Sequence, residues 1–151
     1  MRVVLDSDGL IKLYKAGILG KILDLWEVLV PAAVYEETAQ RGMEEAYPEA
    51  ETIGRLIAGR VRVAPKDPRA QRILRTTRSL GKGERETLHL FFAEGAEGIV
   101  SDDRAFLSVL RRHALPGFPP ALALARLGEE GKLSKDEALA ALEKMRDWVR
   151  E

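Results

Sequence analysis

The sequence contains no cysteine and no asparagine. Without cysteine the chain can form neither a disulfide nor a thiolate metal site, and it has no cysteine nucleophile. No apolar run approaches the roughly 18 residues that a membrane-spanning helix needs. The first residues enter a strand pattern without the features of a signal peptide, so we expect a cytoplasmic protein with no membrane partner.

Neither sign of charge dominates, because 24 lysines and arginines are balanced by 24 acids. Nucleic-acid-binding domains are often basic overall, so this balance counts mildly against that class. Between Arg60 and Lys82, however, eight basic residues accompany a single acid, Asp67. A solvated helix face explains this cluster somewhat better than a phosphate-binding face does. The candidates for phosphate contacts are Arg69, Arg72, Arg75, Arg78 and Lys82.

The order of apolar segments predicts an α/β domain. A length of 151 residues, with 46% hydrophobic and 32% charged residues, is typical of one soluble globular domain. Short buried strands are expected at residues 2–5, 28–30, 61–64 and 98–101. Helices are expected at 10–26 (broken at Gly17 and Gly20), 31–40, 44–58 (interrupted near Pro48), 68–78, 81–93, 103–112 and twice after a loop at 116–120. Helices that alternate with buried strands indicate a parallel sheet.

Four acids lie where this pattern turns from strand to helix: Asp6, Glu37, Glu84 and Asp103. The carboxyl ends of parallel strands meet at one edge of a sheet, so these acids can converge there. Clustered carboxylates repel one another unless a cation lies between them. The sequence therefore predicts a site for a hard divalent metal ion.

Helical phase separates the candidate acids from their neighbours, at 100° per residue. Glu37 falls on the side of Val34 that should meet the sheet, whereas Glu36 points away. Glu84 begins the apolar face of its helix, and Glu86 points elsewhere. Each acid also has an ordinary explanation as a helix cap or a first-turn acid, so the argument depends on the four occurring together.

Four motifs carry a family resemblance: VVLDSDGLI (3–11), VPAAVYEE (30–37), GKGERE (81–86) and GIVSDDRAF (98–106). In this order they resemble the PIN-domain metal-dependent ribonucleases, specifically the small prokaryotic toxins of toxin–antitoxin pairs. The resemblance covers about residues 1–113, and the tail from Pro120 to Met145 is similar to the last helices of one PIN branch. It implies a three-layer α/β/α sandwich with a central parallel sheet of four to five strands. Residues 1–151 would form a single PIN-like domain, with a core at about 1–113 and C-terminal helices at about 119–151.

The resemblance also implies a site and a reaction. Mg²⁺ or Mn²⁺ would be bound by Asp6, Glu37, Glu84 and Asp103, with Asp102 as a further ligand. Participation of Asp8 and Glu86 is left open, and Ser7 and Ser101 match hydroxyl positions of the family. The implied reaction is hydrolysis of an RNA phosphodiester to a 5′-phosphate and a 3′-hydroxyl. An antitoxin protein and a homodimer are the implied partners.

Two alternatives remain at this point. The first motif also resembles the start of haloacid-dehalogenase-type phosphatases, in which Asp6 would be the nucleophile and Asp8 the general acid. That interpretation leaves Glu37 and Glu84 unexplained. The second alternative is a non-catalytic PIN-like binding module, which the neutral net charge and the lack of an evident aromatic platform for bases keep open.

Overall fold

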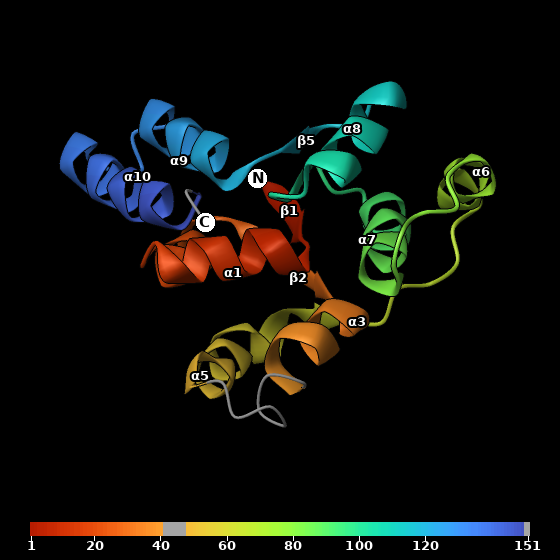
Figure 1. The fold of residues 1–151 in the computed structure, drawn as a ribbon, viewed down its shortest axis with the longest axis horizontal. Helices are drawn as coiled ribbons and strands as arrows, with labels where there is room; N and C mark the ends of the chain where they lie inside the picture. Colours follow the sequence, from red (N-terminus) through yellow and green to blue (C-terminus); the bar gives the residue numbers. More distant parts are fainter. Residues whose placement is uncertain (41–47, 150–151) are drawn as a thin grey trace.

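A parallel sheet forms the centre of the protein (Figure 1). The structure is a computed structural model that describes residues 1–40 and 48–149. The strands run in the order β3-β2-β1-β4-β5. Their bounds are Arg2–Leu5 for β1, Glu27–Pro31 for β2, Val61–Arg62 for β3, Gly98–Val100 for β4 and Gly117–Phe118 for β5. The predicted α/β fold with a parallel sheet of four to five strands is confirmed.

Both faces of the central strand β1 are buried. Val3 and Leu5 join the hydrophobic cluster on one face, and Val4 joins the cluster on the other. Strand β1 pairs with β2 through Val4 and Leu29 and with β4 through Val4 and Ile99. Strands covered on both sides consist of continuous apolar residues rather than alternating ones, which explains the short apolar runs in the sequence.

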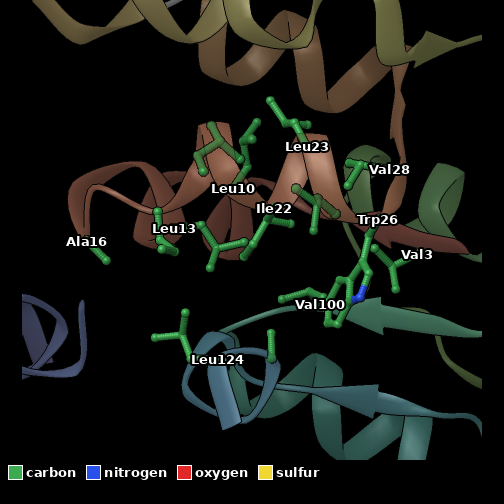
Figure 2. Close-up of a cluster of buried hydrophobic side chains, with 14 of the residues drawn as sticks. Val3, Leu10, Leu13, Ala16, Ile22, Leu23, Trp26, Val28, Val100 and Leu124 are labelled. Atoms are coloured by element: carbon green, nitrogen blue, oxygen red, sulfur yellow. The ribbon is translucent and has the colours of Figure 1, made fainter. Parts of the chain in front are cut away.

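Helices cover the two faces and complete a three-layer sandwich. One layer contains α1 (Ser7–Lys15), α2 (Leu19–Leu25), α5 (Pro48–Ile57), α9 (Pro120–Glu129) and α10 (Lys135–Val149). The other contains α6 (Pro68–Thr76), α7 (Lys82–Ala93) and α8 (Arg104–Arg112). Figure 2 shows the first core, a cluster that includes Leu13 of α1, Ile22 of α2, Leu124 of α9 and Val100 of the sheet.

The helix after β2 ends at Gln40 as predicted, but it begins one residue later and changes its geometry midway. Pro31 is the last residue of β2, because its backbone still pairs with β3 at Arg62. Helix α3 therefore begins at Ala32, and after Tyr35 it continues as a π-helical turn, η1 (Glu36–Gln40). Residues 41–47, part of the segment predicted as a helix at 44–58, lie outside the described residues.

Strand β5 corrects the loop predicted at residues 116–120. Gly117 allows this strand to lie against α8, because a Cβ there would come within 2.4 Å of Leu110 Cδ1. Strand β3 is shorter than the predicted 61–64, and the Val63 that follows it is 85% exposed. Helix α6 ends at Thr76, two residues before its predicted end at Arg78.

The last two helices share the core of the sheet. Leu124, Leu127 and Met145 belong to the same buried cluster as Val3. A short η2 turn (Ala58–Arg60) precedes β3. Among the described helices, none combines the length and the apolar character that crossing a bilayer requires.

Candidate functional site

The predicted acids lie where the direction of the sheet connections reverses. Strand β1 has β2 on one side and β4 on the other, and ligands of open α/β sheets bind at such a switch point, beyond the carboxyl ends of the strands. A cavity of about 130 Å³ opens there. It is lined by Asp6, Ser7, Asp8, Glu37, Gly81, Gly83, Glu84 and Asp103. The structure thus brings the four acids singled out from the sequence into one cavity, and it adds Asp8.

Asp6 is the most buried of these acids, with 3% of its surface exposed. It follows β1 and caps α1, since its Oδ1 accepts a hydrogen bond from the Gly9 backbone N–H at 2.8 Å. Burial raises the pKa of Asp6 to about 7, and the charges of Asp8 and Glu84 act in the same direction. The hydrogen bonds from Gly9 and from the Ser101 hydroxyl oppose this shift. Without a cation, a large fraction of Asp6 therefore keeps its proton near neutral pH.

Gly9 brings the start of α1 against the end of β4. A Cβ at this position would lie 2.5 Å from the Val100 carbonyl oxygen, which is part of the backbone and cannot move aside. The Asp6 backbone N–H donates to the same Val100 oxygen at 3.2 Å. This close approach places the residue after β1 next to the residues after β4.

Ser101 connects the acids that follow these two strands. Its hydroxyl oxygen accepts a hydrogen bond from the Asp103 backbone N–H at 3.1 Å, and its hydroxyl also bonds to the Asp6 carboxyl group. Asp103 caps α8, because its Oδ1 accepts from the Phe106 N–H at 3.1 Å. Since Ser101 is fully buried, it holds two of the predicted acids in fixed positions.

Glu37 and Glu84 approach the cavity from helices. Ser7 Oγ donates to Glu37 Oε2 at 2.6 Å, which ties η1 to the first turn of α1. Gly83 leaves room for this carboxylate, since a Cβ there would lie 2.9 Å from Glu37 Oε1. Glu84 Oε1 accepts from the Gly81 N–H at 3.2 Å and so caps its own helix. A glycine next to a candidate acid in the sequence, as Gly83 is to Glu84, is a signal of such a close approach.

Burial, followed by repulsion between acids, raises the pKa values of Asp6, Asp8 and Glu84 in the cavity. Burial raises the pKa of Asp8, and Asp103, Asp102 and Glu37 raise it further, while Lys12 lowers it. The pKa of Glu84 is also raised by burial, with further increases from Asp103, Asp8 and Glu37. These acids come from four separate segments, so their mutual repulsion acts between elements.

The donor chemistry of the cavity fits a hard divalent cation, because all of its acidic groups are carboxylates. A cation would also relieve the repulsion that raises these pKa values. The carboxylates are too far apart to coordinate one ion together, however. Across residues 1–40 and 48–149, no three histidine or acidic side chains are arranged to hold a metal ion. Binding would therefore require the carboxylates to move inward.

Neighbouring acids have other partners. Asp102, predicted as a further ligand, forms an ion pair with Lys12 at 3.1 Å and does not line the cavity. Glu86 Oε1 accepts a hydrogen bond from the Ala33 N–H at 3.0 Å and thereby anchors the start of α3 to α7. Glu36 points away from the cavity and lies 3.8 Å from Lys82 Nζ. The phase argument that separated Glu37 from Glu36 thus matches their positions.

The candidate phosphate-binding residues do not line the acidic cavity. The Arg69 guanidinium binds the Asp67 carboxylate at 2.9 and 3.1 Å and lies over the Phe92 ring, 5.1 Å from its centroid. Arg72 and Arg75 are exposed on α6, and Arg78 is exposed after it. Lys82, the first residue of α7, is the member of the set nearest to the acids in sequence, beside Gly83 and Glu84. Contact of these residues with RNA stays a prediction.

Comparison with known proteins identifies the fold. A family model, DUF3368, described as a PIN domain, matches residues 2–149. No curated protein matches the chain. The matched region includes all four motifs and both C-terminal helices, and it favours the PIN interpretation of the first motif over the phosphatase one. Because the match extends over nearly the whole sequence, the chain belongs to the PIN-domain family.

Proposed function

We propose that this protein is a metal-dependent endoribonuclease that hydrolyses RNA phosphodiesters in the cytoplasm. Its PIN domain is a nuclease-type fold, which supports a hydrolase acting on nucleic acid. One observation supports the more specific assignment as a metal-dependent endoribonuclease: carboxylates from four separate segments converge on one cavity at the sheet edge. RNA as the substrate and Mg²⁺ or Mn²⁺ as the cofactor are part of the proposal.

The proposed ligands are Asp6, Glu37, Glu84 and Asp103, with Asp8 beside them. A bound divalent ion would lower the pKa of a water molecule and neutralise charge on the scissile phosphate. Asp6 and Asp103 provide fixed oxygens, because an oxygen of each carboxylate accepts a hydrogen bond from a backbone N–H, that of Gly9 or Phe106. Ser101 adds bonds to the Asp6 carboxyl group and to the Asp103 backbone. Glu37 and Glu84 have longer side chains that can turn toward an ion without movement of the backbone.

The neighbouring glutamates Glu36 and Glu37 provide a matched test. Labelled RNA is incubated with the purified protein in Mg²⁺, Mn²⁺ or EDTA, and fragments are resolved by length. Asp6→Asn and Glu37→Gln should each lower the cleavage rate at least ~100-fold, as expected for loss of a group that acts on the reacting phosphate. Glu36→Gln should cleave at the wild-type rate, because this side chain faces away from the cavity. Full activity of Asp6→Asn, or cleavage that persists in EDTA, would contradict the proposal.

The biological role proposed from the PIN resemblance is that of a toxin silenced by an antitoxin protein, with the toxin as a homodimer. Expression of the wild-type chain should then arrest growth, and co-expression of the neighbouring reading frame should relieve the arrest. Asp6→Asn should not arrest growth. Equal growth of cells that express wild type and Asp6→Asn would contradict the toxin role but not the nuclease activity.

A non-catalytic RNA-binding module is the second candidate. The open arrangement of the carboxylates favours it, since no group of three acids in the described part of the chain is ready to hold an ion. In this case the protein would bind the labelled RNA of the assay above and leave its length unchanged in both metals.

A further inference from the structure

A second cavity lies on the opposite side of the start of α7. Its volume is about 310 Å³, and it is formed by the segment after β3 together with α6 and α7. Figure 1 shows α6 beside α7, on the side of the molecule away from α1. The residues of this cavity that matter here are Val63, Lys66, Leu74, Lys82, Arg85 and His89. We call it the basic cavity.

A single helix separates the basic cavity from the acidic one. At 100° per residue, Lys82, Arg85 and His89 share one side of α7, while Glu84 lies on the other. A helix with its side chains is about 10–12 Å wide, so a bound chain needs to cross only one turn to contact both cavities. The N-terminus of α7 lies between them and presents the positive end of the helix dipole to an anion.

The cations of the basic cavity are available to an anionic ligand. Lys66 and Arg85 are exposed, and within the described part of the chain neither side chain forms an ion pair or a hydrogen bond. Lys82 is exposed and lies 3.8 Å from Glu36. The acid that lines the cavity, Glu86, already accepts a hydrogen bond from the backbone of α3. The cavity therefore has an excess of positive charge.

His89 adds a flat ring with a defined donor. Its Nδ1 accepts a hydrogen bond from the Asp67 backbone N–H at 2.9 Å, so Nε2 bears the proton in the neutral ring. Burial lowers the pKa of His89, and the nearby Lys66 lowers it as well. Among the described residues that line the cavity, His89 provides the only ring.

An exposed apolar surface lies beside these charges. Val63 is 85% exposed, and Ala64 and Leu74 are partly buried against the core of that sheet face. An isolated exposed valine needs no explanation, but here it shares a cavity with three cations and a ring. Single-stranded nucleic acid matches this combination, because its phosphates require cations and its bases and riboses require flat or apolar contacts. An acidic peptide would use the cations alone.

We propose that the basic cavity binds single-stranded RNA adjacent to the phosphate that lies in the acidic cavity. This inference rests on the proposed nuclease function for the placement of the scissile phosphate. It assigns phosphate contacts to Lys66, Lys82 and Arg85 rather than to the outer face of α6, where Arg72 and Arg75 lie. Because His89 is the lone ring, recognition of base sequence is weak.

The test measures RNA binding without cleavage. Anisotropy of a labelled single-stranded RNA is recorded in EDTA over a series of salt concentrations, with wild type and with the double variant Lys66→Ala/Arg85→Ala. Loss of two phosphate contacts on a single strand should make the slope of log K against log salt less negative by about 1.4. At ~0.1 M salt this corresponds to an affinity loss on the order of 20-fold. Both side chains are exposed, so the melting temperature should not change.

The matched control is Arg72→Ala/Arg75→Ala, which removes two exposed arginines from α6. The proposal predicts a wild-type slope for this control. An equal effect of the two double variants would overturn the proposal in favour of diffuse attraction to positive charge. An unchanged slope for Lys66→Ala/Arg85→Ala, no RNA binding by wild type, or equal displacement of the RNA by polyglutamate would also overturn it.

Failure of the proposed function gives a different result. Wild type could bind RNA with the predicted dependence on Lys66 and Arg85 but never cleave it. In that case the basic cavity is an RNA-binding site, and the nuclease assignment is wrong. If wild type cleaves RNA and the double variant keeps the wild-type slope, the nuclease assignment stands and the basic cavity is wrong.

Discussion

At the scale of single residues, Asp6 couples the site to stability. Its pKa of about 7 in the folded protein lies above the ordinary value of 3.8, because burial disfavours the charged carboxylate. A raised pKa means that the folded protein retains a proton that the unfolded chain has already lost. The contribution of Asp6 to the free energy of unfolding of the metal-free protein should therefore be greatest at acidic pH and decrease as the pH rises from about 4 to 7.

Comparison of wild type with Asp6→Asn isolates this contribution. For a shift of this size, Asp6 should lower the free energy of unfolding by about 4 kcal/mol across that pH interval. The variant lacks the titrating group, so its decrease should be smaller by that amount, although Asp8 and Glu84 act in the same direction in both proteins. Urea denaturation in EDTA over a pH series measures both profiles, and parallel profiles would contradict the account.

Gly83 offers a second prediction at this scale. Gly83→Ala should displace the Glu37 carboxylate, because the added Cβ would lie 2.9 Å from Glu37 Oε1. We expect metal affinity, measured by titration calorimetry with Mn²⁺, to fall about 10-fold or more, as for loss of a supporting contact at a metal site.

The matched control is Gly128→Ala in α9, where no heavy atom lies within 4 Å of the added Cβ. It should raise the free energy of unfolding by about 0.5–1 kcal/mol and leave metal affinity unchanged. Equal metal affinities of Gly83→Ala and Gly128→Ala would show that Glu37 is not a ligand.

At the scale of elements, the position of Glu37 depends on how α3 begins. Glu86→Ala removes the acceptor of the Ala33 N–H, and we expect the free energy of unfolding to fall by about 1 kcal/mol. The Ser134 hydroxyl caps α10 by accepting a hydrogen bond from the Glu137 N–H at 3.1 Å. Ser134→Ala removes this cap, and we expect a similar decrease in the free energy of unfolding. Of the two, only Glu86→Ala should lower the affinity for Mn²⁺. Equal Mn²⁺ affinities would mean that the start of α3 does not position Glu37.

The elements that position the acids could largely be predicted from the sequence. Asp6 and Asp103 each follow an apolar strand and cap a helix. Both the strand and the cap can be recognised from neighbouring residues in the sequence. Helical phase also placed Glu37 rather than Glu36 toward the cavity, because the π-helical turn begins only at Glu36 and shifts the phase little by the next residue. The capping box that Ser134 and Glu137 form at the start of α10 is another pattern that neighbouring residues determine.

Other features depend on contacts between distant segments. Strand β5 has two residues, and only its pairing with β4 distinguishes it from the predicted loop. The ion pair of Asp102 with Lys12 requires the start of α8 to meet α1, which no local pattern encodes. The sequence likewise could not predict whether Asp8 faces the cavity, since this depends on the rotation of α1 against β4.

At the scale of the whole molecule, the C-terminal helices belong to the core of the nuclease fold. Leu124 of α9 is fully buried in the cluster that contains Leu13 and Val100 (Figure 2). Leu124→Ala should lower the free energy of unfolding by about 2–5 kcal/mol and keep a single transition. Leu122 of the same helix is 55% exposed, and Leu122→Ala should change stability by less than about 0.5 kcal/mol. A separate early transition of α9 and α10 in Leu124→Ala, followed by circular dichroism and tryptophan fluorescence, would contradict a shared core.

The central claim is that the carboxylates at the sheet edge bind a divalent cation. Crystals of the protein soaked in Mn²⁺, with data collected near the manganese absorption edge, test it most directly. The account predicts an anomalous difference peak within ligand distance, about 2.0–2.2 Å, of oxygens of Asp6 and of at least two among Glu37, Glu84 and Asp103. The peak should be absent from Asp6→Asn crystals soaked in the same way. A wild-type map without a peak in this cavity, at a Mn²⁺ concentration that supports RNA cleavage, would contradict it.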